Sequence, residues 1–521
     1  MNRITEQNIN SDGRRLLLNS ESGSIMAVML VIFFLTTILC MGILAISANS
    51  VRLANMQRQG AEAFNIAESG AGLAVEWLSL QAFPPTGLNA FSPTFNGTNV
   101  GAGSFSVTIY PDSGNNINYL KTYRIVSKGT SGAYTKTVEV VWRQGSFGRF
   151  AYFTDSEKSS TGTTIWWKAG ELCDGPAFSN NTGGTNFQIN YSGSTAPIFT
   201  NYLMAAGSSI NYSPTTPTTT SAFNDIYSNG AKGYMLSMAP IALPATSSVQ
   251  QTAAWGASSG YPTTTGVYLR SGSGGGIYIC GDSTVQLART STGAQQVIVK
   301  QGTNTTTITT NISGSSVTTS GPLGTGSSTG MGVIPNGVIY SSGNITSLSG
   351  TVTDNVVSSG VVTTRSAWTI ATDVANSKDI TITGNLLYNT MPDKTQLPNA
   401  ACNLAAGTLG LVARNINIAS TAPANLTIDA VCMAGGSNTT AGSFSAVNYD
   451  TRTPVGTLNV LGGIIQKYRG AVGTFNASTG ATTTGYTKSY SYDPRMATDP
   501  PPYYPTTSTY SKLSWRVIAN Q

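Results

Sequence analysis

A charge-free stretch of thirty residues near the N-terminus is the feature that most limits how this chain can fold. It runs from Ser22 to Val51 and reads SGSIMAVMLVIFFLTTILCMGILAISANSV. A helix needs about 20 apolar residues to cross the hydrocarbon core of a bilayer. A secretory signal peptide has an apolar region of only about 7–15 residues. The sequence therefore predicts a membrane-spanning helix, for which a single-pass anchor is the simplest interpretation.

The helical pattern continues beyond this stretch as an amphipathic segment, so that one helix is predicted from residue 24 to about 80. Apolar and small residues recur there at steps of three and four. They are Leu53, Met56, Gly60, Phe64, Ala67, Ala71, Ala74 and Leu78. Arg14 and Arg15 precede the helix, and the positive-inside rule then keeps the N-terminus in the cytoplasm. We expect the rest of the chain to be exported and the apolar stripe to pack against a folded domain.

Residues 22–80 resemble the N-terminal region of PilX-type minor pilins and related pseudopilins. The resemblance rests on the Arg-containing polar leader, on the abrupt apolar start after Gly23-Ser24, and on the segment AESGAGLAVEWL. It implies a leader peptide, residues 1–23, that a prepilin peptidase removes between Gly23 and Ser24. Major pilins carry a glutamate at the fifth position after the cut, where this chain has Val28. That departure implies a subunit at the tip of a filament rather than a polymerised one.

Three segments with alternating apolar and polar residues follow the helix, at 103–111, 119–132 and 133–143. Such alternation, broken by glycine-containing turns, predicts a small antiparallel sheet. The apolar stripe of the helix would pack on it. Residues 24–148 are therefore expected to form a first domain, a stem helix with a small sheet.

Short apolar runs flanked by Gly, Asn and Ser fill residues 149–484 and predict a large all-β domain. A β-solenoid, in which each coil stacks on the next, suits this pattern, and a β-sandwich is the alternative. The fold class is thus α+β, a long N-terminal helix with a small sheet and then a β domain. The segments GELCDGPAFSNN and NGVIYSSGNITSLSG resemble an uncharacterised domain that follows pilin-like N-termini in bacteria, for which no activity is implied.

Tyrosine and proline dominate residues 485–521. We expect this segment to be a strap that covers the last coil of the β domain. In the alternative interpretation it presents an aromatic binding surface that includes Tyr503 and Tyr504. Trp166 and Trp167 are adjacent, so on a strand their side chains would point to opposite faces. One of them would be buried, and Trp167 is the candidate for the surface.

Four of the five cysteines lie in the exported region and are candidates for disulfides: Cys173, Cys280, Cys402 and Cys432. An even number in an oxidising compartment favours disulfides. Proximity along the chain favours Cys173–Cys280 and Cys402–Cys432, although four cysteines allow three pairings. No C-x-x-C pair is present, so neither a zinc site nor a redox motif is expected.

The composition limits the chemistry that the chain can perform. It contains no histidine, which excludes Ser-His-Asp catalysis and histidine-dependent metal sites. Only 10% of its 521 residues are charged, and no run of basic residues indicates nucleic-acid binding. Asp493 and Arg495, in the motif YDPR, are expected to form a local ion pair or a turn hydrogen bond. We expect no cofactor, no metal and no catalytic residue.

These observations predict a non-enzymatic minor pilin or pseudopilin of a type IV pilus-like system, made in the bacterial inner membrane and then displayed at the cell surface. Its expected partners are other pilins, contacted through the N-terminal helix, and a surface glycan or protein ligand. The β-rich domain would serve adhesion or filament priming. Two alternatives remain: a structural envelope protein anchored by its helix, and a polysaccharide-acting β-helix enzyme.

The leader prediction can be tested on the protein recovered from its native membrane. Cleavage between Gly23 and Ser24 would leave a mature chain that begins at Ser24, and intact-mass and N-terminal analysis would detect it. Replacement of Gly23 by a bulky residue should leave the chain uncut. A native chain that begins at Met1, or after residue 50, would contradict the prediction.

Overall fold

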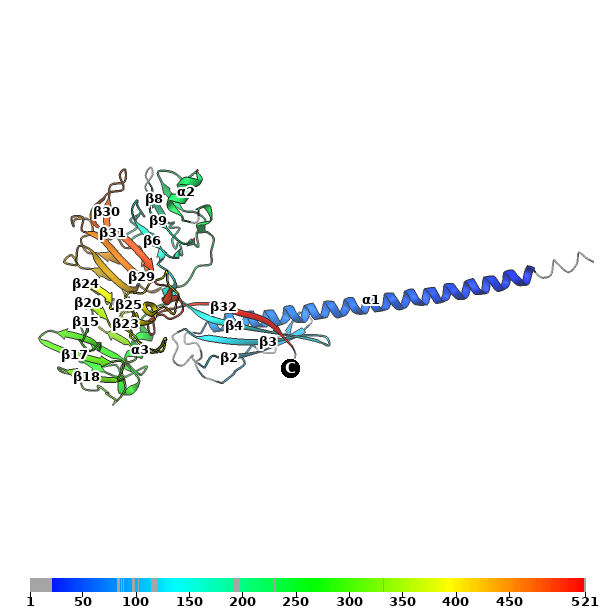
Figure 1. The fold of residues 1–521 in the computed structure, drawn as a ribbon, viewed down its shortest axis with the longest axis horizontal. Helices are drawn as coiled ribbons and strands as arrows, with labels where there is room; N and C mark the ends of the chain where they lie inside the picture. Colours follow the sequence, from blue (N-terminus) through cyan, green and yellow to red (C-terminus); the bar gives the residue numbers. More distant parts are fainter. Residues whose placement is uncertain are drawn as a thin grey trace, which may run out of the picture.

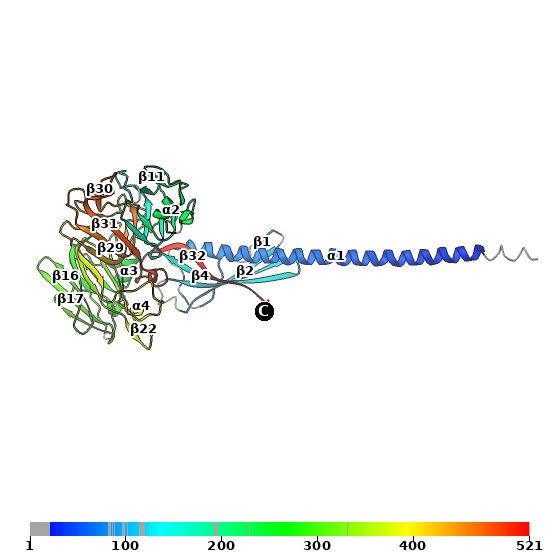
Figure 2. The same ribbon diagram turned by 45° about the horizontal axis from the view of Figure 1, so that its top comes forward.

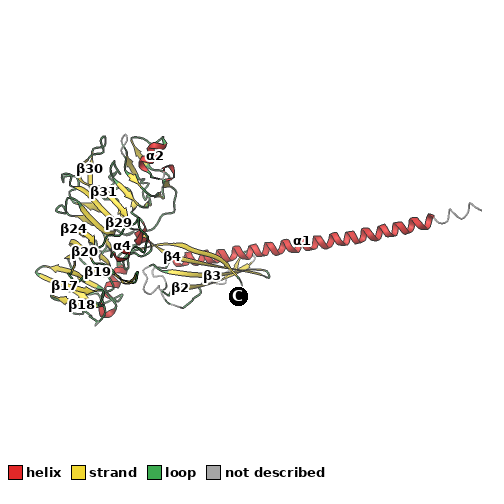
Figure 3. Cartoon of the chain, viewed as in Figure 1, coloured by secondary structure: helices red, strands yellow, loops and turns green. Residues whose placement is uncertain are grey.

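The structure is a computed structural model of the 521-residue chain. It describes residues 21–81, 85, 87, 89–95, 99–101, 103–113, 120–191, 196–228, 230–330 and 332–519. The α+β class is confirmed: one long N-terminal helix carries a small sheet and is followed by a large β domain (Figures 1 and 3).

Helix α1 (Glu21–Ser79) has 59 residues, which corresponds to a length of about 90 Å at 1.5 Å per residue. Its segment Ile25–Ser79 is long and apolar enough to cross a membrane. Nearly every side chain from Ile25 to Arg58 is exposed. Figure 1 shows this half of the helix projecting far from the rest of the molecule.

The second half of α1 packs on a five-stranded antiparallel sheet, which we call the head sheet. Its strands, in spatial order, are β1 (Asn99–Val100), β2 (Gly103–Pro111), β3 (Thr122–Ser131), β4 (Tyr134–Ser146) and β32 (Thr506–Ile518). Ala67, Ala71, Ala74 and Leu78 of the predicted stripe are buried there, whereas Leu53 and Met56 are exposed.

A glycine allows the helix to approach the head sheet closely. A Cβ atom on Gly129 of β3 would lie 2.2 Å from the carbonyl oxygen of Ala63 and 2.4 Å from the backbone nitrogen of Ala67. Neither backbone atom can move without moving the helix. Small residues on both sides thus fix the distance between α1 and β3.

The C-terminal segment differs from its prediction. Residues 482–492 form strand β31 (Thr482–Tyr492) of the large domain, and β32 then returns to pair antiparallel with β4, for example Arg516 with Glu139. The strap predicted over the last coil is therefore wrong for β32, which completes the head sheet. The large domain is inserted between two neighbouring strands of that sheet.

The large domain is a stack of parallel strands, and its first row runs through the whole stack. Its members, in spatial order, are β14 (Ile277–Cys280), β19 (Val338–Ser341), β23 (Ala367–Thr372), β25 (Thr408–Ala413), β27 (Leu426–Ala434), β29 (Gly456–Tyr468), β5 (Tyr152–Ser156), β7 (Ala177–Ser179), β10 (Leu203–Ala205) and β12 (Tyr234–Met235). Buried side chains are in register along it: Ile277, Ile339, Ile370, Leu411, Cys432, Ile464 and Tyr152. Parallel pairing of successive coils favours the solenoid-like arrangement over a sandwich of antiparallel sheets.

Further parallel strands form the adjoining face of the stack. They are β15 (Ser283–Arg289), β20 (Ile345–Val352), β24 (Ile380–Tyr388), β26 (Ile416–Ile418), β28 (Phe444–Ala446), β31, β6 (Leu172–Asp174) and β9 (Ile198–Phe199). An antiparallel sheet extends from β15 through β16 (Gln295–Gln301), β17 (Asn304–Asn311) and β18 (Ser316–Ser320). Strand β13 (Gly266–Leu269) pairs antiparallel with β14.

Short elements cover the stack. The helices are α2 (Thr220–Ile226), α3 (Ser248–Trp255) and α4 (Ala401–Ala405). Three small pairings complete the sheet structure: β8 (Gln188–Asn190) with β11 (Asn211–Ser213), β21 (Val356–Ser358) with β22 (Val361–Thr364), and β30 (Gly473–Phe475) with β31.

The chain does not build this stack from one end to the other. It enters at β5, coils outward to β12, and resumes at β13 and β14 at the opposite end. From there it coils back until β29 pairs with β5, Ile464 beside Tyr152. Figure 2 shows the late strands β29 and β31 between the segments that carry α2 and β17. The two half-stacks thus meet at a seam, formed by β29 with β5 and by β31 with β6.

Two buried ion pairs cross this seam. Arg469 Nη1 lies 2.8 Å from Glu157 Oε2, with both side chains at most 1% exposed, and Lys488 Nζ lies 2.9 Å from Glu171 Oε2. In each pair the cation comes from the C-terminal half-stack and the carboxylate from the N-terminal one. Breaking such a pair leaves an uncompensated buried charge, which is strongly destabilising. The pairs therefore penalise any other register between the two halves.

Neither predicted disulfide is present, because all five cysteines are free. Cys173 lies in β6 and Cys280 in β14, on opposite sides of the seam and several strands apart. Cys432 is buried in β27, whereas Cys402 is only half-buried in the separate helix α4. Burial raises the pKa of the Cys173 and Cys432 thiols, so both are small apolar core residues.

The seam pairs give a direct test of the fold. Replacing Arg469 by Met would leave Glu157 buried without its cation, and we expect a loss of about 3–5 kcal/mol in the free energy of unfolding. The double variant Arg469→Met, Glu157→Leu carries no unpaired charge and should recover most of that loss. Chemical denaturation of the full chain in detergent, followed by tryptophan fluorescence, measures both.

The exposed Arg289→Met variant is the matched control, with an expected change within about 0.5 kcal/mol. Equal destabilisation of the single and double variants would show that packing, and not an unpaired charge, is responsible.

Candidate functional site

A pocket of about 880 Å³, lined by both polar and apolar side chains, lies in the large domain. Its inner wall is formed by β27, β29 and β31, whose residues are in register across the three strands. Thr427, Asn459 and Ser489 form one row, and Asp429, Leu461 and Ser491 form the next. Since Ile428, Val460 and Tyr490 between these rows are buried in the core, alternation turns the two rows outward.

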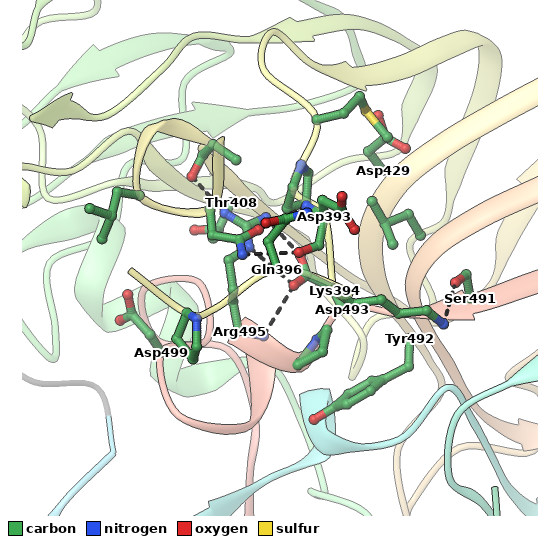
Figure 4. A pocket seen from close by; sticks show the side chains of 18 of the residues that line it. Asp393, Lys394, Gln396, Thr408, Asp429, Ser491, Tyr492, Asp493, Arg495 and Asp499 are labelled. Atoms are coloured by element: carbon green, nitrogen blue, oxygen red, sulfur yellow. Dashed lines mark hydrogen bonds and ion pairs between the residues drawn. The ribbon is translucent and has the colours of Figure 1, made fainter. Parts of the chain in front are cut away.

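Two segments close the pocket over this wall. One runs from Met391 to Ala406 and includes α4, and the other is the turn after β31, with the 3-10 helix Pro494–Ala497. Figure 4 shows Asp429, Ser491, Lys394 and Arg495 around the same space, although they come from different segments. The pocket thus combines strand residues with residues from the path that leads to β32.

The ion pair predicted in YDPR is confirmed and lies in this pocket. Asp493 Oδ1 accepts hydrogen bonds from the Arg495 backbone N–H at 3.1 Å and from its Nε at 3.0 Å, and Oδ2 is 2.7 Å from Nη2. Arg495 Nη1 also donates to the Ala406 carbonyl at 2.6 Å. The pair therefore joins the turn after β31 to the end of the α4 segment.

Asp429 is the unusual residue of the pocket, because its side chain is fully buried and only one of its two carboxylate oxygens has a hydrogen-bond partner. Its Oδ2 accepts a hydrogen bond from the Tyr388 N–H at 3.0 Å, whereas Oδ1 has no partner among the described residues. Burial raises the pKa of Asp429 to about 6; Asp493 adds to this effect, while the Tyr388 N–H and Arg495 oppose it. The Asp429 carboxyl group therefore takes up a proton at a higher pH than an ordinary aspartate does.

The other charged groups at the pocket have partners. Lys394 forms an ion pair with Asp174 and lies 3.4 Å from Ser491 Oγ. Arg365 pairs with Asp499. No cationic side chain that lines the pocket is without an anionic partner in the described structure, so Asp429 adds a carboxylate that no cation contacts directly.

Two of the three predicted surface residues are buried. Trp167 is 0% exposed and packs against Tyr152, Phe199 and Tyr490. Its ring also faces the seam cations, 5.2 Å from Arg469 and 5.0 Å from Lys488. The choice between the adjacent tryptophans was therefore wrong, since Trp166 is the more exposed.

Tyr503 and Tyr504 also differ in burial. Tyr504 is 2% exposed and lies against Gly410, whereas Tyr503 is 40% exposed. The prediction that Tyr504 belongs to a surface site is therefore wrong, and Tyr503 does not line the pocket.

The residues predicted from the sequence do not include this pocket, although the sequence carries one signal for it. Asp429 is the only charged residue in the apolar strand run ANLTIDAVCMAG, and a buried carboxylate in such a run requires a partner or a function. The two segments that close the pocket carry no comparable signal in the sequence, because they meet only in the folded chain. Among the described residues, no group of three or more acidic or thiol side chains could hold a metal ion.

The exposed half of α1 is a second candidate surface. Exposed large apolar side chains follow it from Ile25 to Leu53, including Phe33, Phe34 and Leu44. Gly23 and Ser24 lie within the first turn of α1, and residues 1–20, which hold most of the predicted leader, lie outside the described part of the chain. An apolar surface of this length is stable only in lipid or against other apolar helices.

Comparison with protein-family models returns no match for this chain, and comparison with curated proteins also returns none. Among solved structures, the chain is similar to the competence-associated pilin ComZ from Thermus thermophilus, with 14% identity and a TM-score of 0.28 over 88% of this chain and 98% of that chain. This TM-score is too low to carry an argument about function.

The raised pKa of Asp429 predicts how stability depends on pH. An unfolded aspartate ionises near pH 4, whereas the folded chain holds the proton up to about pH 6. The folded state therefore binds more protons between these values, so this group makes the wild type less stable as the pH rises through the window. Asp429→Asn keeps an acceptor for the Tyr388 N–H and cannot ionise.

We expect Asp429→Asn to gain stability relative to the wild type from pH 4 to pH 7, by at most about 3 kcal/mol. Denaturation midpoints at a series of pH values measure this gain. Asp450→Asn, which removes an exposed carboxylate of the same domain, is the control. A stability difference that is the same at every pH would contradict the assignment.

Proposed function

We propose that this chain is a membrane-inserted minor pilin or pseudopilin that carries its large β domain at the tip of a type IV-like filament. The observation that carries the proposal is the division of α1. Its first half exposes an uninterrupted apolar surface, and its second half packs on an antiparallel head sheet. The same helix can therefore lie in a membrane before assembly and among other helices afterwards.

The length and charge of the first half support this role. From Ile25 to Val51 the helix contains no charged residue, and this segment is about 40 Å long at 1.5 Å per residue. The hydrocarbon core of a bilayer is about 30 Å thick, so the segment spans it with residues to spare. Arg14 and Arg15 favour a cytoplasmic N-terminus, which leaves both folded domains outside.

The size of the large domain supports a place at the tip. The domain extends from β5 to β31 and lies beyond the end of the head sheet, away from the apolar half of α1 (Figure 1). Helices in a filament core pack side by side at about 8–10 Å, and a domain of this width on every subunit would obstruct its neighbours. Val28, where polymerising pilins carry glutamate, fits a single copy at the end.

A purely binding role for the large domain is favoured over catalysis. Glycosidases of the acid–base type require two carboxyl groups that face the same bond. In the described pocket, Asp493 is bound to Arg495, Asp499 to Arg365, and Asp393 to the Thr395 hydroxyl. Among the described carboxyl groups that line the pocket, Asp429 is the one with a buried oxygen that lacks a hydrogen-bond partner.

Imaging of an epitope-tagged chain in cells tests the tip position. We expect the full chain at filament ends only. A matched variant can be made because Thr506 of β32 pairs with Ser146 of β4, so a short turn can replace residues 150–504 and keep the head sheet. This variant lacks the large domain but keeps Val28. Its label in the filament body would assign the tip position to the bulk of the large domain, and its label at filament ends only would assign that position to Val28.

Two outcomes would contradict the proposal. Label of the full chain along the whole filament would exclude the tip position. Label confined to the inner membrane, with unchanged filaments, would favour the anchored envelope protein.

A further inference from the structure

We propose that the pocket between β27, β29, β31 and the α4 segment binds a neutral oligosaccharide, with Asp429 Oδ1 as the acceptor for a ligand hydroxyl. This inference concerns the large domain alone and does not depend on whether the chain enters a filament. It follows from the charges of the pocket, the arrangement of its hydrogen-bonding groups, and its apolar edge.

The charges select a ligand that is not an anion. Arg365, Lys394 and Arg495 are each bound to a carboxylate, so an anionic ligand would have to displace an existing ion pair. The unsatisfied group is Asp429, which needs a hydrogen-bond donor and not an acceptor. A buried polar group without a partner destabilises the folded state, and a ligand hydroxyl would remove that cost.

The inner wall presents hydrogen-bonding groups at a regular spacing. Thr427, Asn459 and Ser489 face outward on three adjacent parallel strands, which lie about 4.8 Å apart. The row is thus about 10 Å long, comparable to a disaccharide. Hydroxyl and amide groups both donate and accept, as recognition of sugar hydroxyls requires.

The rest of the lining supplies surface for the apolar faces of sugar rings. Leu461 lies in the same row as Asp429, while Met391, which is 50% exposed, and Pro392 belong to the covering segment. Tyr492 lies at the edge near Ser491 (Figure 4). A pocket of about 880 Å³ with few convergent polar groups is within the range of small-ligand sites.

The binding test uses the full chain in a detergent without a sugar headgroup, since maltoside or glucoside detergents would compete for the site. The probes are neutral gluco-, manno- and galacto-configured oligosaccharides of two to four units, detected by saturation-transfer NMR and quantified by calorimetry. A uronic-acid oligosaccharide and a linear diamine serve as anionic and cationic probes. We expect saturable binding of at least one neutral oligosaccharide and none of the charged probes.

Two substitutions locate the site. Asp429→Asn replaces the free carboxylate oxygen and is expected to weaken binding at least tenfold. Asn459→Leu removes a donor and an acceptor from the wall without touching a buried charge, and it should weaken binding to a similar extent even if the first variant is poorly folded. Asp450→Asn, outside the pocket, should bind as the wild type does.

Failure to bind any neutral oligosaccharide, or saturable binding of the diamine or the uronic acid instead, would overturn the proposal. So would unchanged affinity in both Asp429→Asn and Asn459→Leu. Because filament position is measured separately by imaging, a negative binding result leaves the tip proposal unaffected.

Discussion

The pairing of β32 with β4 is the interaction on which the arrangement of the whole chain depends. It brings the last strand back to the first domain and forces the large domain to begin and end at neighbouring points. A solenoid built from one end to the other would place its two ends a full stack apart. The chain instead enters the stack in the middle, completes one half, and builds the other half back toward the entry point.

This arrangement creates a seam, and the seam explains an unusual distribution of charge. The chain is poor in charged residues, yet two ion pairs are buried where the half-stacks meet, around Trp167. Buried pairs contribute little net stability compared with apolar residues of the same size. In this chain the two pairs fix the register between the half-stacks, since a shift by one residue would turn each side chain to the opposite face.

Patterns that are local in sequence predicted the structure well, and patterns that require distant partners did not. The apolar stretch and the three-and-four spacing predicted α1, and alternation predicted β2, β3 and β4. The segment of β32, TTSTYSKLSWRVI, follows a proline-rich stretch that favours a strap, and its strand partner lies about 360 residues earlier in the chain.

The candidate site was hidden for the same reason. Trp166 and Trp167 were correctly expected to differ in burial, but alternation alone does not say which face is the core. Proximity along the chain suggested cysteine pairs that the stacking order separates. The pocket depends on strand register and on the return path of the chain, neither of which a single sequence specifies.

The position of the pocket has a mechanical consequence. Asp493, Arg495 and Asp499 line it and also belong to the segment that leads from β31 to β32. A tensile force on a bound ligand would thus act beside the segment that joins the large domain to the head sheet. The force would pass directly to β32 and β4. These two strands run antiparallel over a long ladder, so a pull along their length would shear many hydrogen bonds at once instead of opening them one by one. The outer coils of the stack would carry almost none of that load.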